Sequence, residues 1–69
     1  MKNTVKLRNY LYRIADAIVD NDIRELHLIE QEATVDYTSD NITYKELHVI
    51  STMTNIGTVV SIINSEEEK

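Results

Sequence analysis

An apolar repeat near the start of the chain constrains the fold more than any other feature. Apolar side chains recur there at spacings of four, three and four residues: Leu7, Leu11, Ile14 and Ile18. This spacing places them on one face of an α-helix, and such a face must be covered by another element. We therefore predict a helix over residues 4–20, capped by Asn3 or Thr4 at its start and ended by Asn21-Asp22.

The size of the chain limits how much core it can build alone. It has 69 residues, of which 42% are hydrophobic, so we predict one small domain over residues 1–64 and an acidic disordered tail over residues 65–69. A chain of about 60 residues buries about 60% of its unfolded surface and is marginally stable alone. There is no Cys, which excludes disulfides and thiolate-bound metals as staples. We therefore expect a homodimer.

The cellular location is inferred from what the sequence lacks. No uninterrupted apolar run of about 18 residues is present, so we expect no membrane partner. The basic N-terminus is followed by Leu7-Arg8-Asn9-Tyr10 rather than by the apolar core of a signal peptide. We expect a cytoplasmic protein.

The middle of the chain favours β-structure. Residues 23–33 fit either a helix with an apolar stripe or a strand, and this choice stays open. Residues 35–44 look like a hairpin, with β-prone runs on both sides of Ser39-Asp40-Asn41. The second strand of this hairpin is predicted to continue to about Met53, and after a turn at residues 54–57, which contains Gly57, a further strand is predicted over residues 58–63. The preferred fold is α+β, an N-terminal helix packed on a three- or four-stranded antiparallel sheet whose edge pairs with a second copy.

An all-α alternative starts from a capping box. Thr43-Tyr44-Lys45-Glu46 matches the pattern in which the first and fourth residues cap a helix reciprocally. A helix from there to a turn at Gly57, followed by another short helix, would give four short helices and resemble a helix-turn-helix. The many Val, Ile and Thr residues of 49–63 disfavour this alternative.

Catalytic and metal-binding signatures are missing. No serine lies in a G-x-S-x-G turn, one Gly cannot build a phosphate loop, and His27 and His48 have no triad-like spacing. Asp20-Asn21-Asp22 resembles the start of a calcium loop, but the later ligand positions do not follow. We expect no enzyme activity, no cofactor and no metal.

The charge distribution is the most informative functional feature. Residues 1–13 carry Lys2, Lys6, Arg8 and Arg13 and no acid, whereas the rest of the chain carries a net charge of −9. Eight acids fall between residues 16 and 40 and form the candidate partner-binding surface: Asp16, Asp20, Asp22, Glu25, Glu30, Glu32, Asp36 and Asp40. On a strand, Glu30, Glu32 and Asp36 would share one face, with neighbouring positions about 6.7 Å apart. DNA phosphates have a spacing of the same order, so such a row could occupy a basic DNA-binding groove.

In general character the chain resembles a known group of phage proteins. Short length, the absence of Cys, a residue usage typical of low-GC genes and a carboxylate-rich middle resemble the small acidic host-takeover proteins of Bacillus phages, of the DNA-mimic type. The resemblance implies a dimeric inhibitor that fills the DNA-binding surface of a basic host protein, with the nucleoid-associated protein HU as the leading candidate. The basic N-terminal segment departs from a uniformly acidic mimic.

Two other functions stay open. A small dimeric transcriptional regulator would read DNA through the basic strip, although the net charge of −5 opposes direct nucleic-acid binding. An antitoxin-like interaction protein would pair with a partner through its sheet edge.

Overall fold

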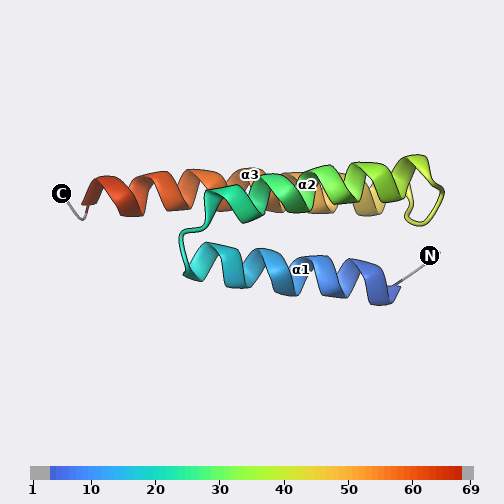
Figure 1. Ribbon diagram of the computed structural model, residues 1–69, viewed down its shortest axis with the longest axis horizontal. Helices are drawn as coiled ribbons and strands as arrows, with labels where there is room; N and C mark the ends of the chain where they lie inside the picture. Colours follow the sequence, from blue (N-terminus) through green and yellow to red (C-terminus); the bar gives the residue numbers. More distant parts are fainter. Residues whose placement is uncertain (1–3, 68–69) are drawn as a thin grey trace.

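The computed structural model describes residues 4–67, and it is an all-helical bundle (Figure 1). The helices are α1 (Thr4–Val19), α2 (Ile23–Thr38) and α3 (Tyr44–Glu67). They run up, down and up, so that α1 and α3 are parallel and α2 lies antiparallel to both (Figure 1). Because α3 has 24 residues and the other two have 16, α3 extends past the turn between α1 and α2. The particle measures 43 × 17 × 15 Å.

Both connections are short because each of the first two helices ends in a Schellman motif. At the end of α1, Asn21 has a φ of 54°, and the amides of Asn21 and Asp22 donate to the carbonyls of Ile18 and Ala17. At the end of α2, Asp40 has a φ of 64° and Asn41 donates to the carbonyl of Asp36. Asn and Asp tolerate this left-handed conformation better than other non-Gly residues do, so the chain reverses twice with its single Gly elsewhere.

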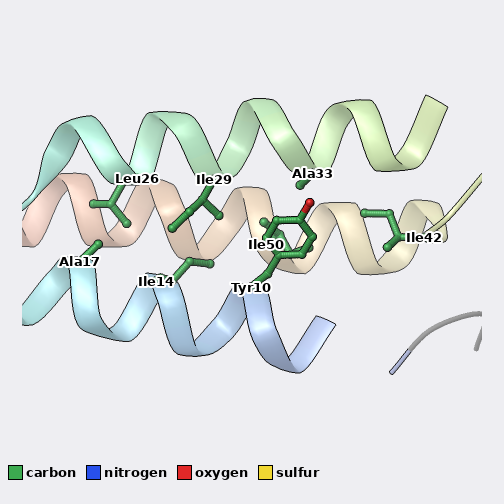
Figure 2. Packing of buried hydrophobic residues seen from close by; sticks show 8 residues of the cluster. All are labelled: Tyr10, Ile14, Ala17, Leu26, Ile29, Ala33, Ile42 and Ile50. Carbon is green, nitrogen blue, oxygen red and sulfur yellow. The ribbon is translucent and has the colours of Figure 1, made fainter. Parts of the chain in front are cut away.

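The core is formed where the three helices face one another. Eight buried hydrophobic residues form it: Tyr10, Ile14, Ala17, Leu26, Ile29, Ala33, Ile42 and Ile50. Their side chains point inward from α1, α2, α3 and the loop before α3 (Figure 2). The predicted helix over residues 4–20 is therefore confirmed, since its apolar stripe packs on or in this core.

The α+β prediction is wrong, since residues 4–67 contain no strand and the all-α alternative is the correct class. Residues 23–33 are helical, and the stripe of Leu26, Ile29 and Ala33 is buried. The helix continues through the β-prone residues 34–38, where the hydroxyl of Thr34 donates to the carbonyl of Glu30, and Val35 is exposed. Burial of the stripe outweighs the local β-propensity. The turn at residues 39–41 exists, but it joins two helices and not two strands.

The alternative is itself corrected at Gly57. The capping box is present, because the Thr43 amide donates to Glu46 Oε1 at 2.9 Å and the Glu46 amide donates to Thr43 Oγ1 at 3.2 Å. The helix does not turn at Gly57 but runs on to Glu67, so the bundle has three helices over the described residues and not four. A Cβ on Gly57 would lie 2.8 Å from Ile18 Cγ1. The Gly therefore serves close packing of α3 on α1 and not chain reversal.

Two sequence expectations concern the last helix. Residues 65–67 of the predicted tail belong to α3, and residues 68–69 lie outside the described residues. Helix α3 contains no uninterrupted apolar run, but over Tyr44–Glu66 it is long and apolar enough to cross a membrane by length and composition alone. In this fold, α1 and α2 cover one side of it.

Candidate functional site

The exposed acids gather at one end of the bundle. The turn between α1 and α2 lies beside the C-terminal part of α3 (Figure 1), where Asn64 Nδ2 donates to Asn21 Oδ1 at 3.2 Å. We call this region the acidic end and define it by four exposed carboxylates: Asp16, Asp20, Asp22 and Glu66. No basic side chain among the described residues forms a salt bridge with any of them.

Helix dipoles add to the negative potential at this end. Helices α1 and α3 both finish there, and neither has a basic residue in its last turn. A helix C-terminus carries about half a negative charge. The N-terminus of α2 points the other way at this end, where Asp22 caps it by accepting from the Glu25 amide at 3.1 Å. The acidic end therefore combines exposed carboxylates with two C-terminal dipoles.

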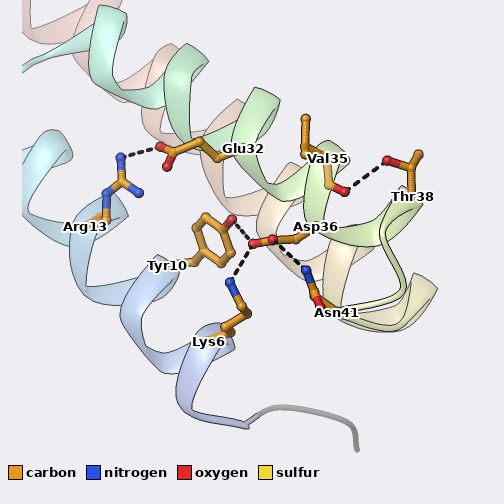
Figure 3. Close-up of polar contacts among 8 residues, drawn as sticks. All are labelled: Lys6, Tyr10, Arg13, Glu32, Val35, Asp36, Thr38 and Asn41. Carbon is orange, nitrogen blue, oxygen red and sulfur yellow. Dashed lines mark hydrogen bonds and ion pairs between the residues drawn. The ribbon is translucent and has the colours of Figure 1, made fainter.

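Two of the predicted acids pair with a base from α1. Arg13 crosses from α1 and donates to Glu25 Oε1 at 2.9 Å and to Glu32 Oε2 at 2.7 Å. Figure 3 shows Arg13 reaching across to Glu32. The hydrogen bond to Glu32, with help from that to Glu25, outweighs the effect of burial and raises the pKa of Arg13 above its ordinary value. Glu25 and Glu32 thus hold α1 and α2 together.

Asp36 is the centre of a second polar cluster (Figure 3). Its Oδ2 accepts from the Tyr10 hydroxyl and, at 3.2 Å, from Lys6 Nζ, and its Oδ1 accepts from Asn41 at 3.3 Å. The hydrogen bond from Tyr10 outweighs the effect of burial and lowers the pKa of Asp36. Burial and the same hydrogen bond raise the pKa of Tyr10 well above its ordinary value.

The expected row of carboxylates does not form. Positions 30, 32 and 36 lie on a helix and not on a strand, so Glu30 faces α3 while Glu32 and Asp36 face α1. Glu30 Oε2 accepts from Ser51 at 3.2 Å and from Thr54 at 3.1 Å. Asp40 follows α2 at the opposite end of the bundle from Asp16, Asp20 and Asp22. The DNA-like spacing derived for a strand therefore has no counterpart in the fold.

A groove of about 550 Å³ lies between α1 and α2. Lys6 and Arg13 line one side, and Glu32 and Asp36 line the other. The charges pair across it, so it offers a ligand no excess of either sign. No group of three or more His, Cys, Asp or Glu residues among those described is placed to hold a metal ion.

One exposed surface escaped the sequence prediction. On the outer side of α3, five exposed residues follow a three- and four-residue spacing: Val49, Thr52, Ile56, Val59 and Ile63. We call this surface the α3 face. Its signal in the sequence is the absence of any Asp, Glu, Lys or Arg between Glu46 and Glu66. The α+β interpretation hid it by dividing these residues between strands.

Comparisons with known proteins give no family for this chain. A scan against protein-family models found no match, and searches of curated proteins and of solved structures found no significant similarity.

Proposed function

We propose that this chain is a non-enzymatic inhibitor that binds a basic nucleic-acid-binding protein through its acidic end and thereby competes with the DNA for that protein. The nucleoid-associated protein HU, the target implied by the resemblance to phage host-takeover proteins, is the first candidate, and the site of action is the host cytoplasm.

The observation that carries this proposal is the arrangement of exposed charge. Asp16 and Asp20 lie one helical turn apart at the end of α1, beside Asp22 at the start of α2, and none has a basic partner among the described residues. Like charges at this spacing destabilise a helix slightly, and two C-terminal dipoles lie at the same end. A cationic partner surface reduces both the repulsion between these carboxylates and the negative potential of the helix ends. Binding is therefore favoured by negative charge that folding leaves unpaired.

The proposal uses fewer of the eight acids than the sequence suggests. Glu25, Glu32, Asp36 and Glu30 are engaged within the bundle by hydrogen bonds or ion pairs. We therefore assign partner contact to the acidic end, not to a continuous row. Electrostatic binding of this kind is fast and weakens steeply as salt rises.

Direct DNA reading has less support. Of the basic strip, Lys6 and Arg13 form ion pairs with carboxylates of α2, and Lys2 lies outside the described residues. Arg8 is exposed. A DNA-binding role would have to break these ion pairs, which disfavours a transcriptional regulator.

The experiment is a competition assay with purified HU and a fluorescently labelled duplex. At low salt, the folded protein is added to the HU–DNA complex while the anisotropy of the duplex is followed. The expected result is release of DNA by the wild type. The variant Asp16→Asn/Asp20→Asn/Asp22→Asn should need about tenfold more protein, equal to about 1.4 kcal/mol of binding. Asn at position 22 preserves the helix cap.

A matched control separates position from net charge. The variant Thr34→Lys/Thr38→Lys/Asp40→Asn changes the net charge by the same three units, but on the remainder of α2 and at the opposite end of the bundle. It should still release DNA at nearly the wild-type concentration. If both variants need equally more protein to release DNA, net charge alone explains the effect. If the wild type releases no DNA, HU is not the target. A shift of the duplex by this protein alone would favour the regulator.

A further inference from the structure

Helix α3 is apolar on more sides than the bundle covers. Its inner side contributes Ile50, and Leu47 and Met53 pack against the core. On its outer side the α3 face remains exposed, with Ile56 50% and Val59 57% accessible. In contrast, the outer sides of α1 and α2 carry charged residues such as Arg8, Asp16 and Arg24. A helix that is apolar nearly all round is normally covered all round, so the single chain leaves the coverage of α3 incomplete.

The spacing of the α3 face suits packing against another helix. Val49, Ile56 and Ile63 are seven residues apart, and Thr52 and Val59 lie between them at the other apolar position of the heptad. Four of the five are β-branched aliphatic residues, whose stiff side chains lose little conformational freedom on packing. The exposed seam runs over about 21 Å from position 49 to 63.

We propose that the α3 face is a self-association surface, on which the α3 helices of two copies of this chain pack antiparallel to each other. This inference does not depend on the target proposed above, although Glu66 of the acidic end also borders the α3 face.

The charges at the two ends of the seam select both the occupant and its direction. Lys45 and Glu66 fall on the same heptad position as Thr52 and Val59, one at each end of the α3 face. Neither is in a salt bridge within the described residues. In an antiparallel pair, Lys45 of each copy comes to the end where Glu66 of the other lies. A parallel pair would instead place Lys45 against Lys45 and Glu66 against Glu66.

The polarity of the whole bundle agrees with the antiparallel arrangement. The acidic end lies where α3 finishes, while the exposed Arg8 lies near the start of α1, beside the start of α3. Antiparallel packing brings the acidic end of one copy towards the basic start of the other. The helix dipoles of the two α3 helices also oppose each other in this arrangement.

A second copy suits α3 better than a lipid bilayer does. A spanning helix would have to leave the bundle, and its inner side then exposes Ser51 and Thr54, which now donate to Glu30. It would also lose the buried contacts of Ile50 and expose the core-facing sides of α1 and α2. A second copy covers the exposed side and keeps every contact of the inner side.

The first test measures mass in solution by sedimentation velocity over a range of concentrations. The wild type should sediment as a dimer that dissociates on dilution. Ile56→Lys, at the centre of the α3 face, should raise the dissociation constant at least about a hundredfold, because it buries an unpaired charge. Leu28→Lys on α2 is the matched control, because Leu28 is 48% exposed against 50% for Ile56. It should leave the dimer intact.

The second test measures direction by disulfide trapping, which is clean because the chain has no Cys. In an antiparallel pair centred between positions 55 and 56, Ile56→Cys lies opposite its own copy. Val49→Cys is then separated from its copy by about 20 Å along the seam, well beyond the reach of a disulfide. Ile56→Cys should form a covalent dimer on mild oxidation and Val49→Cys should not.

Three results would overturn the proposal. The first is a wild type that stays monomeric at every concentration, whether or not that monomer also binds lipid vesicles. The second is equal dimerisation of Ile56→Lys and Leu28→Lys, with circular dichroism showing both variants folded. The third is efficient trapping of Val49→Cys, which would mean a parallel pair.

Discussion

The substitution Gly57→Ala tests the close passage of α3 over α1. In an exposed helix, Ala in place of Gly stabilises by about 1 kcal/mol. Here the added Cβ would lie 2.8 Å from Ile18 Cγ1, 3.1 Å from Ile18 Cδ1 and 3.2 Å from Leu26 Cδ1. Extra volume in a packed core costs about 1–3 kcal/mol. The clash outweighs the gain, and we expect Gly57→Ala to lower the free energy of unfolding by about 1 kcal/mol.

The partner of the clash is identified by a double-mutant cycle. Ile18→Ala alone removes apolar contacts and should destabilise the bundle. In the Gly57→Ala background it also removes the atom nearest to the new Cβ, so its cost should fall by about 1–2 kcal/mol, a coupling typical of residues in contact. Urea unfolding followed by circular dichroism measures all four proteins at one low concentration, which keeps any self-association constant.

A control and a refutation complete this test. Asn55→Ala adds a better helix former at an exposed position of α3 and should stabilise by about half a kcal/mol. Stabilisation of Gly57→Ala by the full helix-propensity gain, with no coupling to Ile18, would contradict this close packing. That result would mean that α3 bends or ends near Gly57, as the sequence alone suggests.

Three further predictions concern polar groups. Tyr10→Phe should destabilise by about 1–2 kcal/mol by removing a hydrogen bond to a charged acceptor, and an NMR titration should show the pKa of Asp36 rising towards its ordinary value of 3.8. Because the pKa of Asp36 is lowered in the fold, ionised Asp36 contributes stability that is present above about pH 3.8 and is lost as the pH falls through its folded pKa. Tyr10→Phe should reduce this contribution, so that the free energy of unfolding, followed by circular dichroism, falls less steeply as the pH is lowered. Ser61→Ala should stabilise by about 1 kcal/mol, because the fully buried Ser61 hydroxyl has no hydrogen-bond partner among residues 4–67; destabilisation on thermal unfolding would contradict this. Thr43→Ala should cost about 1 kcal/mol by removing one half of the capping box, whereas Thr43→Ser should unfold near the wild-type temperature.

The first helix was predictable because one periodicity fixed it. Leu7, Leu11, Ile14 and Ile18 match a helical period and no other, and Asn21-Asp22 end the helix where the left-handed Asn21 reverses the chain. The turn at residues 39–41 was also found, because Ser, Asp and Asn favour turns between either kind of element. Turn residues mark where a segment ends but not what kind of segment it is.

The β-strands were predicted wrongly because local propensity was given more weight than periodicity. Val35 and the Thr residues around it favour strands locally, but Leu26, Ile29 and Ala33 bury a helical stripe just before them, and the helix continues from there to Thr38. Gly57 was misleading in the same way, since a lone Gly marks either a turn or a close contact. Only the position of Ile18 on another helix distinguishes the two.

The candidate site was predictable in part. The excess of acidic residues over positions 16–40 is evident from the sequence. Which of them are paired within the bundle is not, because pairing with Arg13, Lys6 and Tyr10 depends on which side of α2 each carboxylate lies. The uncharged stretch after Glu46 was also visible in the sequence. Its meaning as an exposed face depends on the three-helix packing that the strand interpretation excluded.

The most direct test of the proposed function is to map where a basic partner touches the bundle. Isotope-labelled protein is titrated with unlabelled HU at low salt, and the amide chemical shifts of residues 4–67 are followed. The largest changes are expected at Asp16, Asp20, Asp22 and Glu66, and they should disappear at high salt. Changes centred on the α3 face or on the α1–α2 groove, or no change at any residue, would contradict binding through the acidic end.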